Sequence, residues 1–338
     1  MFREILNKIV RKTDLSEEEM SEMITEIFSG ALTDAQIGAM MAALATKGET
    51  FEELAGAAKA MRRKAVRIHC SASVIVDTCG TGGDYANTFN ISTTTAFVVA
   101  GAGVTVAKHG NRSISSQSGS ADLLEALGMK LDIPPELVEE AIEEIGIGFL
   151  FAPVFHGAMK HVAKARKEVG IRSIFNMLGP LTNPAGANCQ LLGVYAPELT
   201  EMFAQALRIL KSRRAFVVHG HEGLDEISVC GPTRVSELKD GLIQTYDIYP
   251  ENYFGDLASA EDIKGGTPAE NAKIALSIFE GEKGPRRNIV LINAAAALVA
   301  AGYAGDLSEG IGIAEKSIDT CAAKEKLNAL IRFTQDNR

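Results

Sequence analysis

The sequence has no tryptophan, few aromatic residues, and only five cysteines among 338 residues. No two cysteines are spaced as C-x-x-C, so neither a zinc site nor a dithiol redox site of that kind is expected. An odd number of scattered cysteines also argues against a disulfide framework, and it favours a reducing compartment, which predicts a cytoplasmic location. The five are Cys70, Cys79, Cys189, Cys230 and Cys321.

Positive charge is not in excess either. The chain has 34 Lys and Arg against 43 Asp and Glu, which gives a formal net charge of −9. A general nucleic-acid binder needs a basic surface, so no nucleic-acid partner is expected. No apolar run is long enough to span a bilayer, and the N-terminus is too charged for a signal peptide, so no membrane partner is expected. Small anionic substrates held with a metal fit this composition better.

The glycine-rich loop DTCGTGGD, from Asp77 to Asp84, is neither a G-x-G-x-x-G nor a Walker loop, which argues against dinucleotide and P-loop binding. It follows the β-branched run at 74–76, which predicts a buried strand ending at Asp77. Three loop residues lack a Cβ, so the backbone there can adopt positive φ and bring its N–H groups close to an oxyanion: Gly80, Gly82 and Gly83. Such a cluster is often only a tight turn, so the phosphate interpretation needs support elsewhere. Cys79 has no base identified nearby and is expected to pack inside the turn.

Two features further along the chain favour an anion. Asn90, Ser92 and Thr93 precede an apolar stretch, where one of them caps a helix and leaves free amides at its N-terminus. The KHGNR run ends an apolar stretch, so Lys108 is expected at the C-terminal edge of a strand, where open α/β sheets bind ligands. A solvated Lys and Arg pair is the commoner outcome, and His109 is equally consistent with a structural histidine. A second helix start at 118–120 beside the lysine favours the phosphate interpretation.

The segment HEGLDE places two carboxylates, Asp225 and Glu226, next to each other where a strand ends. Mg²⁺ takes one or two carboxylates together with substrate oxygens and water, so this pair suits a metal held beside phosphate groups. An isolated Asp-Glu pair would more commonly be a solvated turn. The pair therefore gains weight only together with the glycine loop and Lys108.

Residues 1–72 are predicted to be almost entirely helical. Three capping boxes mark helix starts: Ser16 with Glu19, Thr33 with Gln36, and Thr50 with Glu53. Apolar residues between Ile37 and Leu44 recur at helical intervals. The pattern predicts a small all-helical domain.

From Val74 onward strands and helices alternate, which predicts an α/β domain with a mainly parallel central sheet flanked by helices. Beyond the first strand, the candidates are Val104–Ala107, Leu191–Tyr195, Ala215–His219, Glu226–Val229, Leu242–Tyr246 and Asn288–Ile292. Helices are expected at Asp122–Leu127, Pro135–Ile145, His156–Val169, from Thr267, and at Ser317–Phe333.

The run IRSIFNMLGPLTNPAG, within 170–186, contains Gly-Pro and Asn-Pro turns that suit a connection between domains. We therefore expect the helical domain to be discontinuous. The predicted limits are 1–72 plus roughly 166–186 for the small helical domain, and 73–165 plus 187–338 for the α/β domain.

Six motifs occur in one order along the chain: GTGGD, N-I-S-T, KHGNR, SGSADLLEALG, GPLTNPA and GLDE. Together they resemble the anthranilate phosphoribosyltransferases of tryptophan biosynthesis, over nearly the whole chain. That family shares its fold, a helical domain plus an α/β domain, with the pyrimidine nucleoside phosphorylases. The resemblance implies transfer of the phosphoribosyl group of 5-phosphoribosyl 1-pyrophosphate to anthranilate, with Mg²⁺ as cofactor and a homodimer as the assembly.

The resemblance also implies a role for each matching residue. The phosphoribosyl pyrophosphate side comprises Gly80, Gly82, Gly83, Asp84, Thr88, Asn90, Ser92, Thr93, Lys108 and Ser120. The metal side comprises Ser92, Asp225 and Glu226. The anthranilate side comprises Gly80, His109, Asn111, His156 and Arg166, and the catalytic group comprises Lys108, Asn111 and Arg166.

Arg166 also has a simpler interpretation. Its helix carries Lys160, Lys164 and Lys167 on one stripe, which is typical of a solvated face. Arg166 lies roughly 120° from that stripe, so it can point elsewhere, and its planar guanidinium suits a carboxylate.

Two alternative functions remain open from the sequence. One is a pyrimidine nucleoside phosphorylase-like enzyme, and the other is a transferase-like protein that binds nucleic acid. KHGNR, GPLTNPA and the carboxylates of GLDE favour the transferase over the phosphorylase, while the acidic charge counts against the nucleic-acid binder. A dimer is expected through the helical domain, with the apolar positions of Ile37–Leu44 available to a partner.

Overall fold

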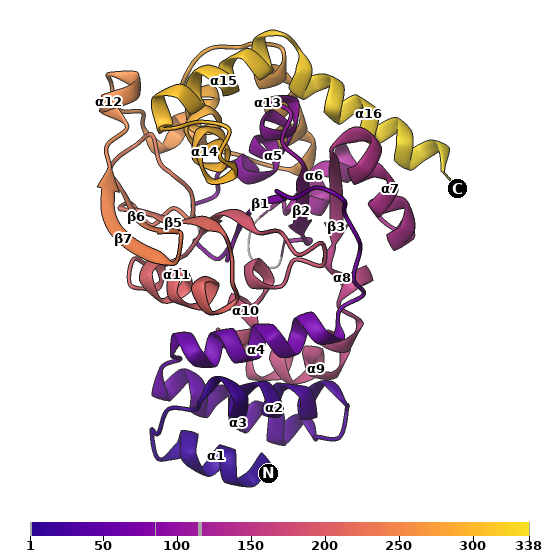
Figure 1. Cartoon of the computed structure of the whole chain (residues 1–338), viewed down its shortest axis with the longest axis vertical. Coiled ribbons are helices and arrows are strands. Elements are labelled where there is room, and N and C mark those ends of the chain that lie inside the picture. The colour runs from indigo at the N-terminus through magenta and orange to yellow at the C-terminus, as the bar shows by residue number, and fades with distance from the viewer. Residues whose placement is uncertain (1, 85, 114–116, 338) are drawn as a thin grey trace.

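The computed structural model describes residues 2–84, 86–113 and 117–337, and it stacks a helical layer against an α/β layer (Figure 1). In the helical layer α9 packs on α3 and α2, although it is far from both in sequence. Among the described residues no helix has the length and apolarity needed to cross a membrane. The helices of this layer are α1 (Phe2–Val10), α2 (Glu17–Phe28), α3 (Asp34–Lys47), α4 (Phe51–Lys64) and α9 (Lys160–Val169).

The three predicted capping boxes are confirmed at the starts of α2, α3 and α4. In each, the hydroxyl of the N-cap residue accepts from the backbone N–H three residues later, which satisfies one of the free donors of the first turn. The apolar face of α3 between Ile37 and Leu44 is buried in the chain's own core. The expectation that these positions are available to a partner is therefore wrong.

A seven-stranded sheet has the order β3-β2-β1-β4-β5-β6-β7. β1 to β5 are parallel to one another, while β6 pairs antiparallel with both β5 and β7, which confirms a mainly parallel sheet. The strands are β1 (Val76–Gly80), β2 (Val106–Gly110), β3 (Ile147–Phe151), β4 (Cys189–Gly193), β5 (Arg214–Gly220), β6 (Thr233–Lys239) and β7 (Leu242–Ile248).

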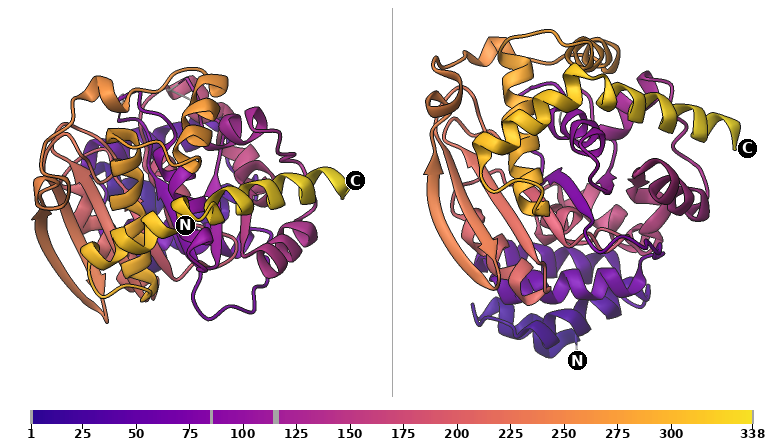
Figure 2. Two further views of the ribbon diagram at one scale, coloured as in Figure 1. Left: turned by 90° about the horizontal axis from the view of Figure 1, so that it is seen from above. Right: turned by 45° about the horizontal axis from the view of Figure 1, so that its top comes forward.

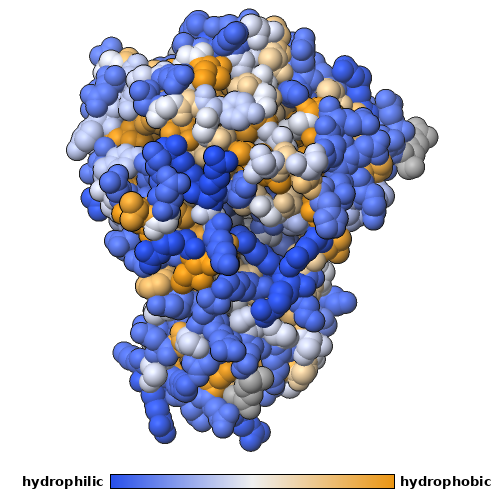
Figure 3. All heavy atoms as spheres, in the orientation of Figure 1, coloured by the Kyte–Doolittle hydropathy of each residue, from blue (hydrophilic) through white to orange (hydrophobic). Residues whose placement is uncertain are grey.

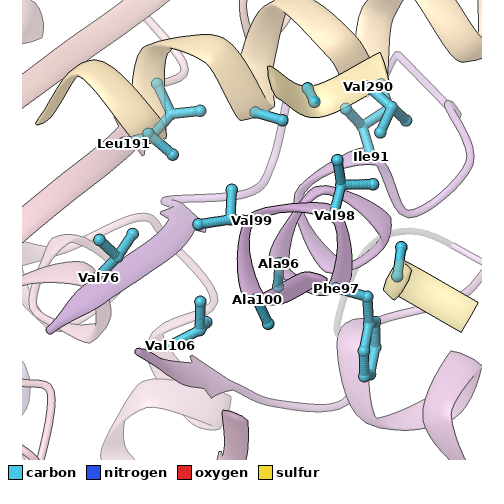
Figure 4. Close-up of a cluster of buried hydrophobic side chains, with 14 of the residues drawn as sticks. Val76, Ile91, Ala96, Phe97, Val98, Val99, Ala100, Val106, Leu191 and Val290 are labelled. Carbon is cyan, nitrogen blue, oxygen red and sulfur yellow. The ribbon is translucent and has the colours of Figure 1, made fainter. Parts of the chain in front are cut away.

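Helices cover both faces of the sheet, which Figure 2 shows from two further directions. α5 and α14 lie on one face, and Figure 4 shows apolar side chains of α5 packed between β1, β2 and α14. α11 packs on the other face and separates the sheet from α4. The helices of the α/β layer are α5 (Ile91–Gly101), α6 (Ser120–Ala126), α7 (Pro135–Ile145), α8 (Ala152–Phe155), α10 (Ile174–Met177), α11 (Leu199–Ile209), α12 (Glu251–Phe254), α13 (Pro268–Phe279), α14 (Pro285–Ala301), α15 (Leu307–Asp319) and α16 (Ala322–Asp336).

Two predicted strands are wrong. Asn288–Ile292 lies inside α14, a helix buried on nearly all sides, and a short apolar run does not distinguish such a helix from a buried strand. Glu226–Val229 forms no strand, and β6 follows it instead. β3 was not predicted, because its five residues follow directly on the helix α7.

Element boundaries also differ from the predictions. β1 and β2 run on to Gly80 and Gly110, so Asp77 and Lys108 lie inside strands rather than after them. The predicted last helix is two helices, α15 and α16, separated at Cys321, whose φ of 62° is left-handed. α9 begins at Lys160, after a short 3-10 turn at 157–159, rather than at His156.

On the face drawn in Figure 3, hydrophilic side chains predominate over both layers, with separate hydrophobic spots between them.

Candidate active site

The candidate site lies at the C-terminal edge of the sheet. The chain adds β2 and β3 on one side of β1 and then returns to add β4 on the other side. In open α/β sheets ligands bind outside the carboxyl ends of the strands where the strand order reverses in this way. β1, β2 and β4 each end at a glycine: Gly80, Gly110 and Gly193.

Two of these glycines allow Asp225 to lie directly on the strand ends. A Cβ at Gly193 would lie 1.5 Å from the carbonyl oxygen of Asp225, and one at Gly80 would lie 2.4 Å from its Oδ2. Any larger residue would therefore displace this carboxylate. The same Oδ2 accepts a hydrogen bond of 2.8 Å from the backbone N–H of Gly82, whose φ of 64° is left-handed.

Asp225, which is half-buried, and Glu226, which is buried, form a carboxylate pair. Glu226 Oε1 accepts from the backbone N–H of Ser92, at 3.1 Å, in the first turn of α5. Burial, together with the nearby charge of Asp84, raises the pKa of Asp225 to about 7. Burial and then the charge of Asp225 raise the pKa of Glu226 well above its usual range. The pair is therefore an unstable dianion unless a cation binds beside it.

The positive charge of Lys108 acts on this pair and lowers the pKa of Glu226, against the effect of burial. Its Nζ is buried, donates to the carbonyl oxygen of Thr78 at 2.5 Å and lies 3.5 Å from Ser92 Oγ. Burial lowers the pKa of Lys108, while the charge of Asp77 and, more weakly, that of Glu226 raise it. A phosphate group placed here would meet an ammonium group and the first-turn amides of α5 together.

The residue after Lys108 faces the other side of the sheet. His109 Nδ1 lies 3.0 Å from the carbonyl oxygen of Gly179 and donates to it, so the neutral ring leaves Nε2 unprotonated. The His156 ring is tilted against it, with 5.0 Å between the ring centroids. Burial lowers the pKa of His109 to about 3 and that of His156 to about 4, so both rings are neutral near pH 7. Among the described residues, no hydrogen-bond partner faces His109 Nε2, whereas the backbone of Thr182 lies close to the His156 ring and acts against the lowering of its pKa.

Comparisons with known proteins agree with this geometry. A model of a glycosyl transferase family, a/b domain, matches residues 72–324, and a model of the helical bundle domain of a glycosyl transferase family matches residues 3–65. An anthranilate phosphoribosyltransferase of Desulfosudis oleivorans is 69% identical over 338 residues, which is 100% of each chain. The chain belongs to the anthranilate phosphoribosyltransferase family. The predicted family and fold class are confirmed.

Two solved anthranilate phosphoribosyltransferases have the same fold. The enzyme from Thermus thermophilus is 43% identical with a TM-score of 0.93, covering 98% of this chain and 99% of that one. The enzyme from Saccharomyces cerevisiae in complex with PRPP and Mg is 30% identical with a TM-score of 0.90, covering 99% of this chain and 98% of that one.

Five of the ten residues predicted for phosphoribosyl pyrophosphate contact the carboxylate pair or act on it by their charge. Hydrogen bonds and charge interactions link Gly82, Asp84, Ser92, Lys108, Asp225 and Glu226, with Gly80 beneath Asp225. Asn90, before α5, bonds to Ser118 and Asn271 on neighbouring segments. Ser120 opens α6, and Gly83 accepts a hydrogen bond from the guanidinium of Arg172.

Other predicted residues lie apart from this cluster. Thr88 pairs with Lys264 through an isolated bridge, and Thr93 is buried with no hydrogen bond to its hydroxyl among the described residues. Asn111 is exposed, and its side-chain oxygen accepts from the N–H of Arg112. Arg166 is half-buried on α9, which lowers its pKa, and the described residues provide no hydrogen bond or ion pair between it and the cluster. The lysine stripe beside it is exposed, as expected.

Sequence reasoning assigned no role to Asp77, Asn183 or Arg172. Asp77 and Asn183 are buried and joined by a hydrogen bond of 2.8 Å between Oδ2 and Nδ2. Asn183 belongs to GPLTNPA, one of the motifs that carried the family resemblance, whereas Asp77 lies three residues before GTGGD, at the start of the glycine-rich loop. Arg172 stacks on the ring of Tyr195, at 4.2 Å from its centroid, and no pattern in the sequence indicated this contact.

Proposed function

We propose that the chain transfers the 5-phosphoribosyl group from 5-phosphoribosyl 1-pyrophosphate to the amine of anthranilate, as a step of tryptophan biosynthesis. The products are N-(5-phosphoribosyl)anthranilate and pyrophosphate. One observation carries the proposal: Lys108, the first turn of α5, the glycine loop and the Asp225–Glu226 pair meet at one edge of the sheet. This is a donor set for a diphosphorylated sugar with a metal.

The residues present fit Mg²⁺. Asp225 and Glu226 supply two adjacent carboxylates, of which Glu226 is buried and Asp225 half-buried, and the Ser92 hydroxyl lies within reach of Lys108 in the same cluster. The described residues contain no group of three or more His, Cys, Asp and Glu side chains arranged for a metal, so the remaining ligands would be substrate oxygens and water. When bound, the ion would neutralise charge on the pyrophosphate leaving group.

The chain's own contribution is positioning and charge stabilisation. Lys108 and the amides of the glycine loop hold the phosphate groups, so that the bond from the anomeric carbon to pyrophosphate breaks while negative charge moves toward Lys108. The amine of anthranilate is already neutral near pH 7 and attacks the anomeric carbon without a protein nucleophile. The proton that the nitrogen loses as the C–N bond forms passes to water or to the departing pyrophosphate. Holding the two reactants together supplies much of the remaining rate.

The anthranilate side is assigned to the face with the two histidines. Neutral, buried rings of His109 and His156 provide an apolar surface for an aromatic substrate. Arg166 is proposed to face the substrate carboxylate, and Asn111 to contact the amine. Thr88, Thr93 and Ser120 complete the proposed phosphate side.

A fluorescence assay tests the proposal. Anthranilate fluorescence should fall only when phosphoribosyl pyrophosphate and Mg²⁺ are both present, and omission of either should abolish the change. Release of free base from thymidine or uridine with phosphate would favour the phosphorylase instead. Tight, salt-sensitive binding of single-stranded DNA without turnover would favour the nucleic-acid binder.

The assembly and compartment are also proposals. We infer a homodimer through the helical layer, where Val10 at the end of α1 is an apolar side chain 64% exposed. Sedimentation showing only monomer at micromolar concentration would contradict it.

All five cysteines are free thiols, which supports a cytoplasmic, reducing location. The domain limits proposed from the sequence remain 1–72 plus roughly 166–186, and 73–165 plus 187–338.

A further inference from the structure

β1 and β2 separate where the site begins. β1 pairs with β4 at five positions, from Val76 to Gly80, and β2 pairs with β3 at five positions. In contrast, β1 and β2, whose residues are all described, pair only at Val76 and Val106. The backbone groups that a longer ladder would satisfy therefore need other partners.

Two side chains supply those partners. Asp77 Oδ1 accepts from the backbone N–H of His109 at 3.1 Å, and its Oδ2 accepts from Asn183 Nδ2 at 2.8 Å. Asn183 Nδ2 also donates to the carbonyl oxygen of Ala107 at 2.7 Å. Asp77 is 0% exposed and Asn183 is 4% exposed, so these bonds are shielded from water.

Asn183 brings the connecting segment 170–186 into the same arrangement. Its Oδ1 accepts from the backbone N–H of Ala185 at 2.9 Å, which fixes the amide orientation. The same segment accepts from the His109 ring through the carbonyl oxygen of Gly179. The end of β2 is thus held by β1 through Asp77 and by the connecting segment through Asn183.

We propose that Asp77 and Asn183 are a positioning pair that sets the place of β2 at the site, and with it both Lys108 and His109. The inference rests on the proposed function, because these two residues carry the phosphate and anthranilate sides. Neither member of the pair touches the reacting atoms. A shift of β2 by about 1 Å would move both sides together, and a misplacement of that size costs about a hundredfold in rate.

A matched control exists at the opposite end of β1. Asn188 Oδ1 accepts from the backbone N–H of Ile75 at 3.0 Å, and its Nδ2 donates to the carbonyl oxygen of Ser73 at 2.9 Å. Asn188→Ala therefore removes two side-chain bonds to the backbone next to β1, far from the carboxyl ends of the strands. Asn183→Ala also removes two side-chain bonds to the backbone, at Ala107 and Ala185, together with the bond to Asp77. Any effect of general loosening should appear in both variants.

The kinetic test compares Asp77→Asn, Asn183→Ala and Asn188→Ala by kcat/KM and thermal unfolding. We expect roughly tenfold to hundredfold losses of kcat/KM for the first two, with KM raised for both substrates, and a change within about twofold for the control. In a Lys108→Ala background, Asp77→Asn should lower kcat/KM by a smaller factor than in the unsubstituted chain, because one of the two groups that it positions is already absent. An equal factor in both backgrounds, or an Asn188→Ala loss as large as that of Asn183→Ala, would overturn the proposal.

Hydrogen–deuterium exchange gives a readout that does not depend on turnover. Amides of Val106–Gly110 should exchange faster in Asp77→Asn and Asn183→Ala than in the unsubstituted chain, while those of Ile147–Phe151 stay protected. Unchanged exchange across β2 in both variants would refute the pair. An unsubstituted chain without turnover would contradict the proposed function, and the exchange result would then decide on the pair alone.

Discussion

Lys108 and His109 are neighbours in β2, yet they serve opposite faces of the sheet. Lys108 lies among Thr78, Ser92 and the carboxylates of Asp225 and Glu226, whereas His109 lies against His156 and the connecting segment. Successive side chains of a strand point to opposite faces, so one dipeptide supplies both environments. The comparison shows how a short strand separates a charged side from a neutral aromatic side.

Burial has different consequences on the two faces. On the charged face it raises the pKa of Asp225 and lowers that of Lys108, so the cluster favours a bound metal and a polyanion that restore charge balance. On the neutral face it keeps His109 and His156 uncharged, which suits an aromatic ring. Substitutions that alter one face, or neither, distinguish the two environments.

Lys108→Ala alters the charged face most strongly. Because Lys108 stabilises charge on the leaving group, we expect kcat to fall on the order of a hundredfold or more at saturating substrates. The exposed Lys160→Ala is the control and should turn over normally. Near-normal turnover of Lys108→Ala in the anthranilate fluorescence assay would show that the role is wrongly assigned.

Gly193→Ala displaces Asp225 on the charged face without removing a charge. Its Cβ would meet the Asp225 carbonyl oxygen at 1.5 Å, so we expect a loss of roughly 1–3 kcal/mol in the free energy of unfolding. The accompanying shift of the carboxylate should lower kcat/KM at least about tenfold. Gly312→Ala, on an exposed helical position with open space around it, is the control. Chemical denaturation and the turnover assay should separate the two variants. An equal free energy of unfolding and an equal kcat/KM in both would contradict the close contact between Gly193 and Asp225.

His156→Phe tests the neutral face through pH. The folded pKa of His156, about 4, lies below its ordinary value of 6.5, so folding favours the neutral ring. The contribution of this neutral ring to the free energy of unfolding is complete above pH 6.5. It is lost as pH falls toward 4, by about 1.4 kcal/mol per pH unit. His156→Phe should reduce this slope, whereas the exposed His69→Gln should leave it unchanged. If the free energy of unfolding fell equally steeply with pH in all three proteins, the neutral state of the His156 ring would be wrongly assigned.

Ser16 lies in the helical layer, so Ser16→Ala alters neither face of the sheet. The Ser16 hydroxyl accepts from the Glu19 N–H at the start of α2, so its loss should cost about 1 kcal/mol in the free energy of unfolding. Turnover should remain unchanged, because the helical start lies far from the sheet edge. A drop in kcat would mean that the helical layer influences the site more directly than these contacts indicate.

The sequence was informative where chemistry requires a particular residue type. The glycine loop, Lys108 and the Asp225–Glu226 pair were predicted from motifs, and the structure brings them together. α14 was mistaken for a strand because a fully buried helix has no polar stripe. The bond between Asp77 and Asn183 could not be predicted, because it depends on how far β1 and β2 separate in the folded chain.

The most direct test of the division between the two faces is the pair of Michaelis constants in Lys108→Ala and His156→Phe. The account predicts a crossed pattern: Lys108→Ala raises KM for phosphoribosyl pyrophosphate and leaves KM for anthranilate near its original value, while His156→Phe does the reverse. If both variants raised the same KM, the two sides of β2 would not serve different substrates, and the account would be contradicted.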